Sequence, residues 1–189
     1  MALKRGTEIP TIDVVLVTLS TQGVSPTEIA LDTANKIAVE VQSEVTEAIK
    51  NIVKGVLIAQ KGAQTTITGH IITLTDNVFN YELAKMLQGG TITYDTETPT
   101  KAVGYTPPVS GSKEQGDICT LNAYSAIYDT AGIITGYEKI SYPNCKGNPF
   151  GLNSEDGVFR VSEYTINSAP AKGQAPYSIS IVDELPTIS

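Results

Sequence analysis

Apolar and polar residues alternate along several stretches of this chain, and this period-two pattern limits the fold more than any other feature of the sequence. Between residues 36 and 45, β-branched apolar residues stand at Ile37, Val39, Val41 and Val45, and the polar residues Glu40, Gln42 and Glu44 occupy the other face. Successive side chains of a strand point to opposite faces of its sheet. The segment is therefore predicted to be a strand with one buried face and one wet face.

Similar alternation recurs along the rest of the chain. Val, Ile, Thr and Tyr fill these runs, and such side chains suit a pleated surface. Turn-forming residues separate them, as at Asp129 to Gly132 and at Asn153 to Gly157. The further predicted strands cover residues 65–74, 91–94, 118–128, 133–142, 158–166 and 177–182. Many short strands joined by turns predict a mainly β fold, either a sandwich or a barrel.

One segment, at about residues 77–88, has helical periodicity instead. Its apolar residues form one stripe: Phe79, Leu83, Met86 and Leu87. Asp76 or Asn77 is expected to cap the start of this helix, and Gly89 is expected to take the left-handed position at its end. The stripe is interpreted as core packing of a short helix on a sheet, because nothing in it suggests a cofactor site.

Residues 45–62 fit two different structures. The apolar residues from Val45 to Val53 fit a helix, whereas Ile52 to Lys61 also fits one side of a long hairpin that closes at Lys61-Gly62. Periodicity alone does not decide between them. A protruding hairpin arm is the favoured interpretation, because strand patterns flank the segment on both sides.

The chain is interpreted as a single domain, residues 1–189, with an N-terminal segment, residues 1–30, whose docking the pattern does not define. Two Pro-rich stretches, Thr96 to Ser112 and Ser168 to Pro176, are predicted to be loops within that domain. Neither is interpreted as a domain linker, because strand patterning resumes directly after each. A chain of 189 residues is long enough for one well-filled core.

The charge of the chain excludes a simple phosphate-binding role. The formal net charge is -7 and no cluster of Lys and Arg occurs, whereas duplex binding relies on such residues. Charged residues make up 17% of the chain, below the roughly 25% of a typical soluble protein, so neighbouring subunits or Ser and Thr must solvate or cover the surface. The apolar run Ile12 to Leu19 is too short to cross a bilayer, and no signal peptide is expected.

No catalytic or cofactor site is predicted. His70 is the single histidine, so an ordinary zinc site is not expected. Cys119 and Cys145 lack metal-like spacing and are interpreted as reduced thiols, with an inter-subunit disulfide as the alternative. The acidic pairs Glu155-Asp156 and Asp183-Glu184 lie in turn-like sequence and are interpreted as solvated carboxylates. The chain is therefore predicted to be a binding or assembly protein and not an enzyme.

Two stretches of the chain carry a resemblance to a known family. The first contains Thr65-Thr66-Ile67-Thr68-Gly69 and Thr75-Asp76-Asn77-Val78-Phe79, and leads into Glu82 to Gly90. The second contains Tyr142-Pro143-Asn144-Cys145-Lys146-Gly147 and Glu155-Asp156-Gly157-Val158-Phe159-Arg160, with Glu163-Tyr164 and a closing Leu185-Pro186. In their order and in the strand–helix–strand layout, these stretches resemble the major tail tube proteins of bacteriophages and phage-tail-like particles.

The resemblance implies a β-sandwich or half-barrel with one flanking helix and a long hairpin arm. It implies hexameric rings whose sheets join into one inner barrel, and rings that stack into a hollow tube through which DNA passes without specific binding. It implies a location in the virion tail after assembly in the host cytoplasm. Sheath, tape measure, terminator and baseplate proteins are further partners of such tubes, and neither a contractile nor a non-contractile tail is singled out.

The resemblance also assigns two groups of candidate residues. The arm that contacts neighbouring subunits or rings would carry Glu47, Ile49, Ile52, Val53, Val56 and Ile58. The wall of the lumen would carry Glu40, Gln42, Glu44 and Glu163, and acidic walls repel phosphates and keep DNA mobile.

One alternative belongs to a different functional class. A carbohydrate- or surface-binding β-sandwich module would have the same strand pattern. Such a module is expected to expose aromatic residues on one face, whereas this chain has no Trp and its nine Tyr are scattered.

Overall fold

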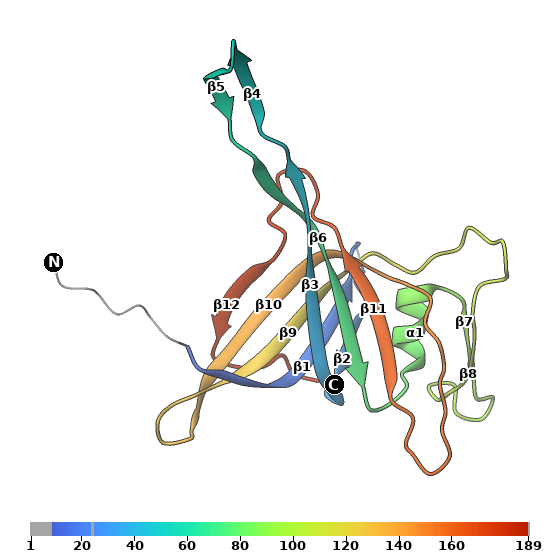
Figure 1. Cartoon of the computed structure of the whole chain (residues 1–189). Helices are drawn as coiled ribbons and strands as arrows, with labels where there is room; N and C mark the ends of the chain where they lie inside the picture. Colours follow the sequence, from blue (N-terminus) through green and yellow to red (C-terminus); the bar gives the residue numbers. More distant parts are fainter. Residues whose placement is uncertain (1–8, 24, 189) are drawn as a thin grey trace.

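The computed structural model of the protein describes residues 9–23 and 25–188. Strands dominate this part of the chain, and one short helix lies beside them (Figure 1). In chain order the elements are β1 (Thr11–Thr21), β2 (Glu28–Leu31), β3 (Ala34–Thr46), β4 (Ile49–Val53), β5 (Val56–Lys61), β6 (Gln64–Asp76), α1 (Tyr81–Gln88), β7 (Thr91–Tyr94), β8 (Ala102–Thr106), β9 (Cys119–Tyr128), β10 (Ile134–Gly147), β11 (Ser162–Ser168) and β12 (Ser178–Val182). The mainly β class, the single flanking helix and the hairpin arm are confirmed.

An eight-stranded antiparallel sheet forms the body of the protein. Its order is β2-β1-β9-β10-β11-β6-β3, and β12 pairs with the first half of β10. Two further ribbons, β4-β5 and β7-β8, lie outside this sheet. Within the described residues the sheet stays open and does not close into a barrel. Figure 1 shows β3, β6 and β11 crossing in front of β1, β9 and β10, which gives a sandwich-like arrangement.

The core lies between these two groups of strands. On β1 and β9, Val17 is opposite Ala123, and Leu19 is opposite Leu121. On β6 and β11, Ile72 is opposite Ile166. These residues join one buried cluster together with Leu83, Met86 and Leu87 of α1, while Phe79 packs against its margin. The helix thus closes one end of the core with its apolar stripe.

The cap of α1 differs from the one expected. Asn80 is the N-cap, and its side-chain oxygen accepts a hydrogen bond from the backbone N–H of Leu83 at 2.9 Å. Asp76 does not cap the helix, because its carboxylate accepts from the Thr33 hydroxyl at 2.6 Å and so fixes the end of β6. Gly89 ends the helix with a positive φ of 85°, although its ψ of -161° is not that of the left-handed helix.

Three parts of the chain differ from the sequence predictions or were not defined by them. The N-terminal segment provides β1, which is an interior strand of the sheet, and β2, which is an edge strand. The expected loop at residues 96–112 contains β8, which pairs with β7. The strand expected at residues 158–166 begins only at Ser162, and residues 158–161 belong to an exposed loop.

The expected burial of one face of β3 is wrong for the isolated chain. Val39, Val41 and Val45 are 39%, 55% and 63% exposed. The physical reason is that β3 is the edge strand, so only its first residues reach the core, where Ala34 is buried and Ile37 is partly buried. Alternation thus identified the strand correctly but not what covers its apolar face.

The β3–β6 pair continues into a hairpin that projects beyond the sheet (Figure 1). It closes at Lys54-Gly55, whose φ values of 48° and 81° are both positive, as a type I′ turn requires. The expected closure at Lys61-Gly62 is therefore wrong, because Lys61 pairs with Ile49 inside the ribbon. From residue 38 to residue 68 every residue is exposed except Ala48, which is half-buried.

Candidate functional site

The tip of the hairpin arm carries apolar side chains on both of its faces. The register places Ile52 opposite Leu57 and Val53 opposite Val56, and a bulge leaves Ile58 between paired residues. Each of these side chains is at least 50% exposed. The six arm residues named from the sequence all lie on this ribbon or at its base: Glu47, Ile49, Ile52, Val53, Val56 and Ile58.

An arm of this kind is poorly stable by itself. An isolated two-stranded hairpin is at best marginally stable in water, because it has no second layer to bury its apolar face. Contiguous exposed apolar side chains on a soluble protein usually mark an interaction surface. The arm is therefore a candidate assembly surface.

The arm is also the basic part of an acidic protein. Between residues 46 and 63 it carries Lys50, Lys54 and Lys61 against the single acid Glu47, whereas the whole chain has a net charge of -7. All four side chains are exposed. A partner surface for this arm is expected to combine apolar groups with negative charge.

The four residues named as lumen candidates lie on one exposed face of the sheet. Glu40 is opposite Ile71, and Ile71 is opposite Asn167. Thr75, four residues after Ile71 on β6, points to the same face as Ile71 and is opposite both Lys36 and Glu163. Glu163 therefore projects from the same face as Glu40. Gln42 and Glu44 follow on β3 at two-residue intervals.

This face is not purely acidic. Lys36 lies in the same cross-strand row as Glu163, and Lys146 lies opposite Asn167 in the row of Glu40. Sequence reasoning did not place these two lysines there, because register across four strands cannot be derived from alternation within one strand. The face therefore has mixed charge with an acidic excess along β3.

His70 is a packed core residue. Its side chain is 2% exposed, and its ring packs edge-on against Tyr142 at 5.3 Å and Tyr177 at 5.5 Å between centroids. Burial lowers the pKa of His70 from its usual 6.5, because the charged form loses its hydration. The neutral, enclosed ring has no exposed position from which to transfer a proton to a substrate.

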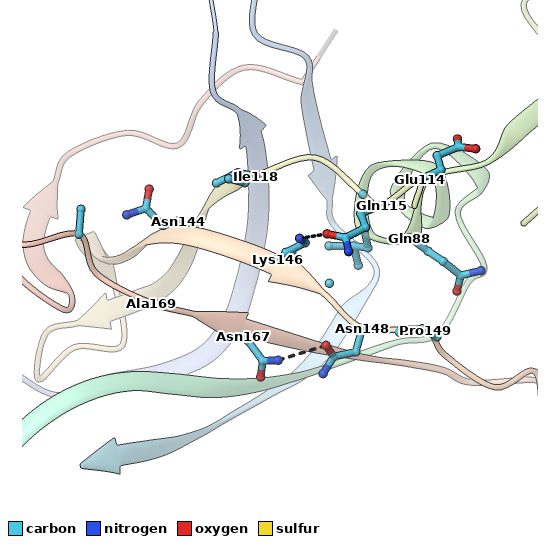
Figure 2. Close-up of a pocket in the computed structure, with 14 residues that line it drawn as sticks. Gln88, Glu114, Gln115, Ile118, Asn144, Lys146, Asn148, Pro149, Asn167 and Ala169 are labelled. Carbon is cyan, nitrogen blue, oxygen red and sulfur yellow. Dashed lines mark hydrogen bonds between the residues drawn. The ribbon is translucent and has the colours of Figure 1, made fainter. Parts of the chain in front are cut away.

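A groove lies beside the C-terminal end of α1 (Figure 2). Its volume is about 740 Å³, and its wall includes five amide side chains: Gln88, Gln115, Asn144, Asn148 and Asn167. Asn167 donates to the Asn148 side-chain oxygen at 3.1 Å, and Lys146 donates to the side-chain oxygen of Gln115. The wall also carries Glu114, whose carboxylate accepts a hydrogen bond from the backbone N–H of Gly90 at 2.9 Å.

Sequence reasoning did not find this groove. The backbone at Gly116 and at Gly147, two residues that line the groove, passes very close to Leu87 at the end of α1. A Cβ at either position would collide with Leu87. The only signal was the presence of glycine at these two positions, and glycine occurs at many other positions in the chain.

Across residues 9–23 and 25–188, no three His, Cys, Asp or Glu side chains lie close enough to hold a metal ion. No helix in the part of the chain that the structure describes is long and apolar enough to cross a membrane.

Comparison with known proteins gives only a distant likeness among solved structures. No family model matches the chain, and no curated protein matches it. A chain in the cryo-EM structure of the anti-feeding prophage (AFP) baseplate, 6-fold symmetrised, is 8% identical, with alignment of 95% of this chain and 97% of that chain. The TM-score of 0.35 is too low to indicate a shared fold, so this likeness assigns neither fold nor function.

Proposed function

We propose that this protein is a structural subunit that assembles with copies of itself into stacked rings, as the tail tube of a phage or phage-tail-like particle. The observation that carries the proposal is the exposed apolar arm between β3 and β6. A soluble monomer gains nothing from projecting such a ribbon into water, whereas a neighbouring copy would bury it.

The open sheet supports the same proposal. An unpaired edge strand is a template for pairing with another chain. The edge strand β3 combines its free edge with an exposed apolar face at Val39 and Val41. A contact between this edge and a different edge of the next copy is heterologous, and heterologous contacts that close by rotation form rings.

In this proposal the exposed face with Glu40, Gln42, Glu44 and Glu163 lines the lumen. Its acidic excess would keep DNA from adhering during passage. The subunit would be a single domain without a catalytic site or cofactor, assembled in the host cytoplasm and located in the virion tail. Rings would be hexameric, with tail sheath, tape measure, terminator or baseplate proteins as further partners.

The carbohydrate- or surface-binding alternative has weaker support. Its best candidate site is the amide-lined groove, since amides can bond sugar hydroxyls. None of the described residues that line this groove is aromatic, and the groove therefore lacks the stacking surface expected for such a module.

The proposal is tested by negative-stain microscopy and light scattering on the purified full chain over a range of concentrations. Rings or tubes of uniform diameter are expected. A strict monomer at every concentration, including after addition of an excluded-volume agent, would overturn the proposal.

A further inference from the structure

A second exposed surface lies in the loop between β10 and β11, residues 148–161. Every residue from 151 to 161 is exposed. The loop nevertheless carries several large apolar side chains: Leu152, Val158, Phe159 and Val161. Phe159 is 94% exposed. Neither the core nor the amide-lined groove uses these side chains.

The loop is fixed at both of its ends. Phe150 packs edge-on against Tyr164 at 5.1 Å and lies 6.0 Å from the Phe79 ring. The guanidinium carbon of Arg160 lies 4.9 Å from the centre of the same Phe79 ring. Both ends are thus held near one aromatic residue beside α1, and the intervening residues 151–159 are exposed to solvent.

The charge of this loop complements that of the arm. Glu155 and Asp156 lie at its exposed turn, while Arg160 is engaged at its base. The arm tip has the opposite character, with Ile52, Val53, Val56 and Leu57 next to Lys50 and Lys54. Apolar side chains flanked by opposite charges on two surfaces are what a specific interface requires.

The arm and the loop lie at opposite ends of the protein (Figure 1). Ser162, which follows the loop, is opposite Asp76 at one end of β6, and the arm begins beyond Gln64 at the other end. The thirteen residues of β6 span roughly 40 Å at about 3.3 Å per residue. The arm therefore cannot reach the loop of its own chain, but the two surfaces are placed for head-to-tail contact between copies.

From this geometry we infer that the loop at residues 148–161 is the acceptor for the arm tip of a second copy of this chain. The inference rests on the proposed self-assembly and specifies the contact that carries it. Because one end of each copy binds the opposite end of the next, the contact is heterologous, and repeating it without closure by rotation generates a stacked filament.

A charge-reversal experiment tests this contact. The double variant Glu155→Lys/Asp156→Lys is expected to raise the critical concentration for assembly by roughly tenfold or more at low salt, because it places lysines against lysines. The matched control Asp183→Lys/Glu184→Lys changes the net charge equally at another exposed acidic pair. Adding Lys50→Glu/Lys54→Glu to the loop variant is expected to restore assembly.

Cysteine cross-linking tests proximity directly. The native cysteines are buried, so Lys54→Cys and Asp156→Cys place the only exposed thiols on the arm tip and the loop. Mild oxidation of the double variant is expected to give a ladder of covalent oligomers. The control Lys54→Cys/Thr130→Cys, in the exposed β9–β10 turn, is expected to give none.

Failure of this inference is distinguishable from failure of the proposed function. A wild-type chain that never assembles would overturn both. Suppose instead that the wild type assembles, that the Glu155/Asp156 reversal assembles as well as the Asp183/Glu184 control, and that the Lys54→Cys/Asp156→Cys variant gives no cross-link. The assignment of the loop as acceptor is then overturned, and self-assembly stands.

Discussion

Cys119 lies directly opposite Cys145 across β9 and β10, and both side chains are fully buried. Burial raises the pKa of Cys119 to about 12 and that of Cys145 to about 11, because a thiolate would lose its hydration there. Both groups are therefore unreactive thiols at neutral pH. Neither sulfur is exposed to a neighbouring copy, which argues against the inter-subunit disulfide considered from the sequence.

Thiol accessibility follows from this pairing. Native protein is expected to react with an aromatic disulfide reagent far more slowly than protein in denaturant, where two thiols per chain should react. Assembled material is expected to run as monomer on a non-reducing gel. A dimer band that disappears on reduction would contradict the burial of this pair.

Alkaline pH is expected to lower the free energy of unfolding. In the unfolded chain these thiols ionise with a pKa near 9.0, whereas the folded protein keeps them protonated up to about pH 11 or 12. The stabilisation is thus fully present below pH 9 and is lost as the pH rises through the folded pKa values. At pH 10 the shift of each thiol is expected to have lowered the free energy of unfolding by about 1.4 kcal/mol relative to its value below pH 9.

Urea unfolding at pH 8 and pH 10 measures this effect. The double variant Cys119→Ala/Cys145→Ala controls for the other titrating groups and is expected to lose less stability between the two pH values. An equal loss in both proteins would show that the thiols are not shielded.

Two isoleucines separate core packing from assembly. Ile166 is fully buried, and Ile166→Ala is expected to cost about 2–5 kcal/mol of unfolding free energy. Ile58 is 61% exposed on the arm, and Ile58→Ala is expected to change that free energy by less than about 0.5 kcal/mol. Only the Ile58 variant should weaken assembly without weakening the fold. Denaturant unfolding of dilute protein and light scattering of concentrated protein report the two quantities.

The cap of α1 gives a test between two asparagines. Asn80→Ala removes the acceptor for the Leu83 N–H and is expected to cost about 1 kcal/mol. Asn77→Ala removes only an exposed side-chain contact with Asn35 and is expected to cost less than about 0.5 kcal/mol. A larger loss for Asn77→Ala would favour the cap position expected from the sequence.

Alternation was sufficient to locate most strands, because period two is a property of the strand itself. The segment at residues 91–94 is β7 with the expected bounds, and the strand expected at 118–128 is β9 within one residue. The short strand β8 was missed, because prolines on both sides of it and Gly104 within it indicate a loop, and only its pairing with β7 makes it a strand.

Alternation could not predict whether the apolar face of a strand is covered by the rest of the chain. Val41 has the pattern of a buried residue, yet β3 is an edge strand and the side chain is 55% exposed. The opposite error concerns the loop at residues 158–161, where Phe159 resembles a core residue and is almost fully exposed. Both deviations concern exposed apolar side chains, and both fall on the surfaces proposed for assembly.

Deletion of residues 46–61 is the most direct test of the central claim. The register pairs Val45 with Thr65, so Gly62, Ala63 and Gln64 remain to close the shortened hairpin. Because the arm makes no contribution to the buried core, the variant is expected to keep the β circular dichroism of the wild type and a cooperative unfolding transition. Sedimentation velocity at high concentration should then show monomers, whereas rings or tubes are expected from the full chain. Normal tubes from the deletion variant would contradict the claim that this arm drives assembly.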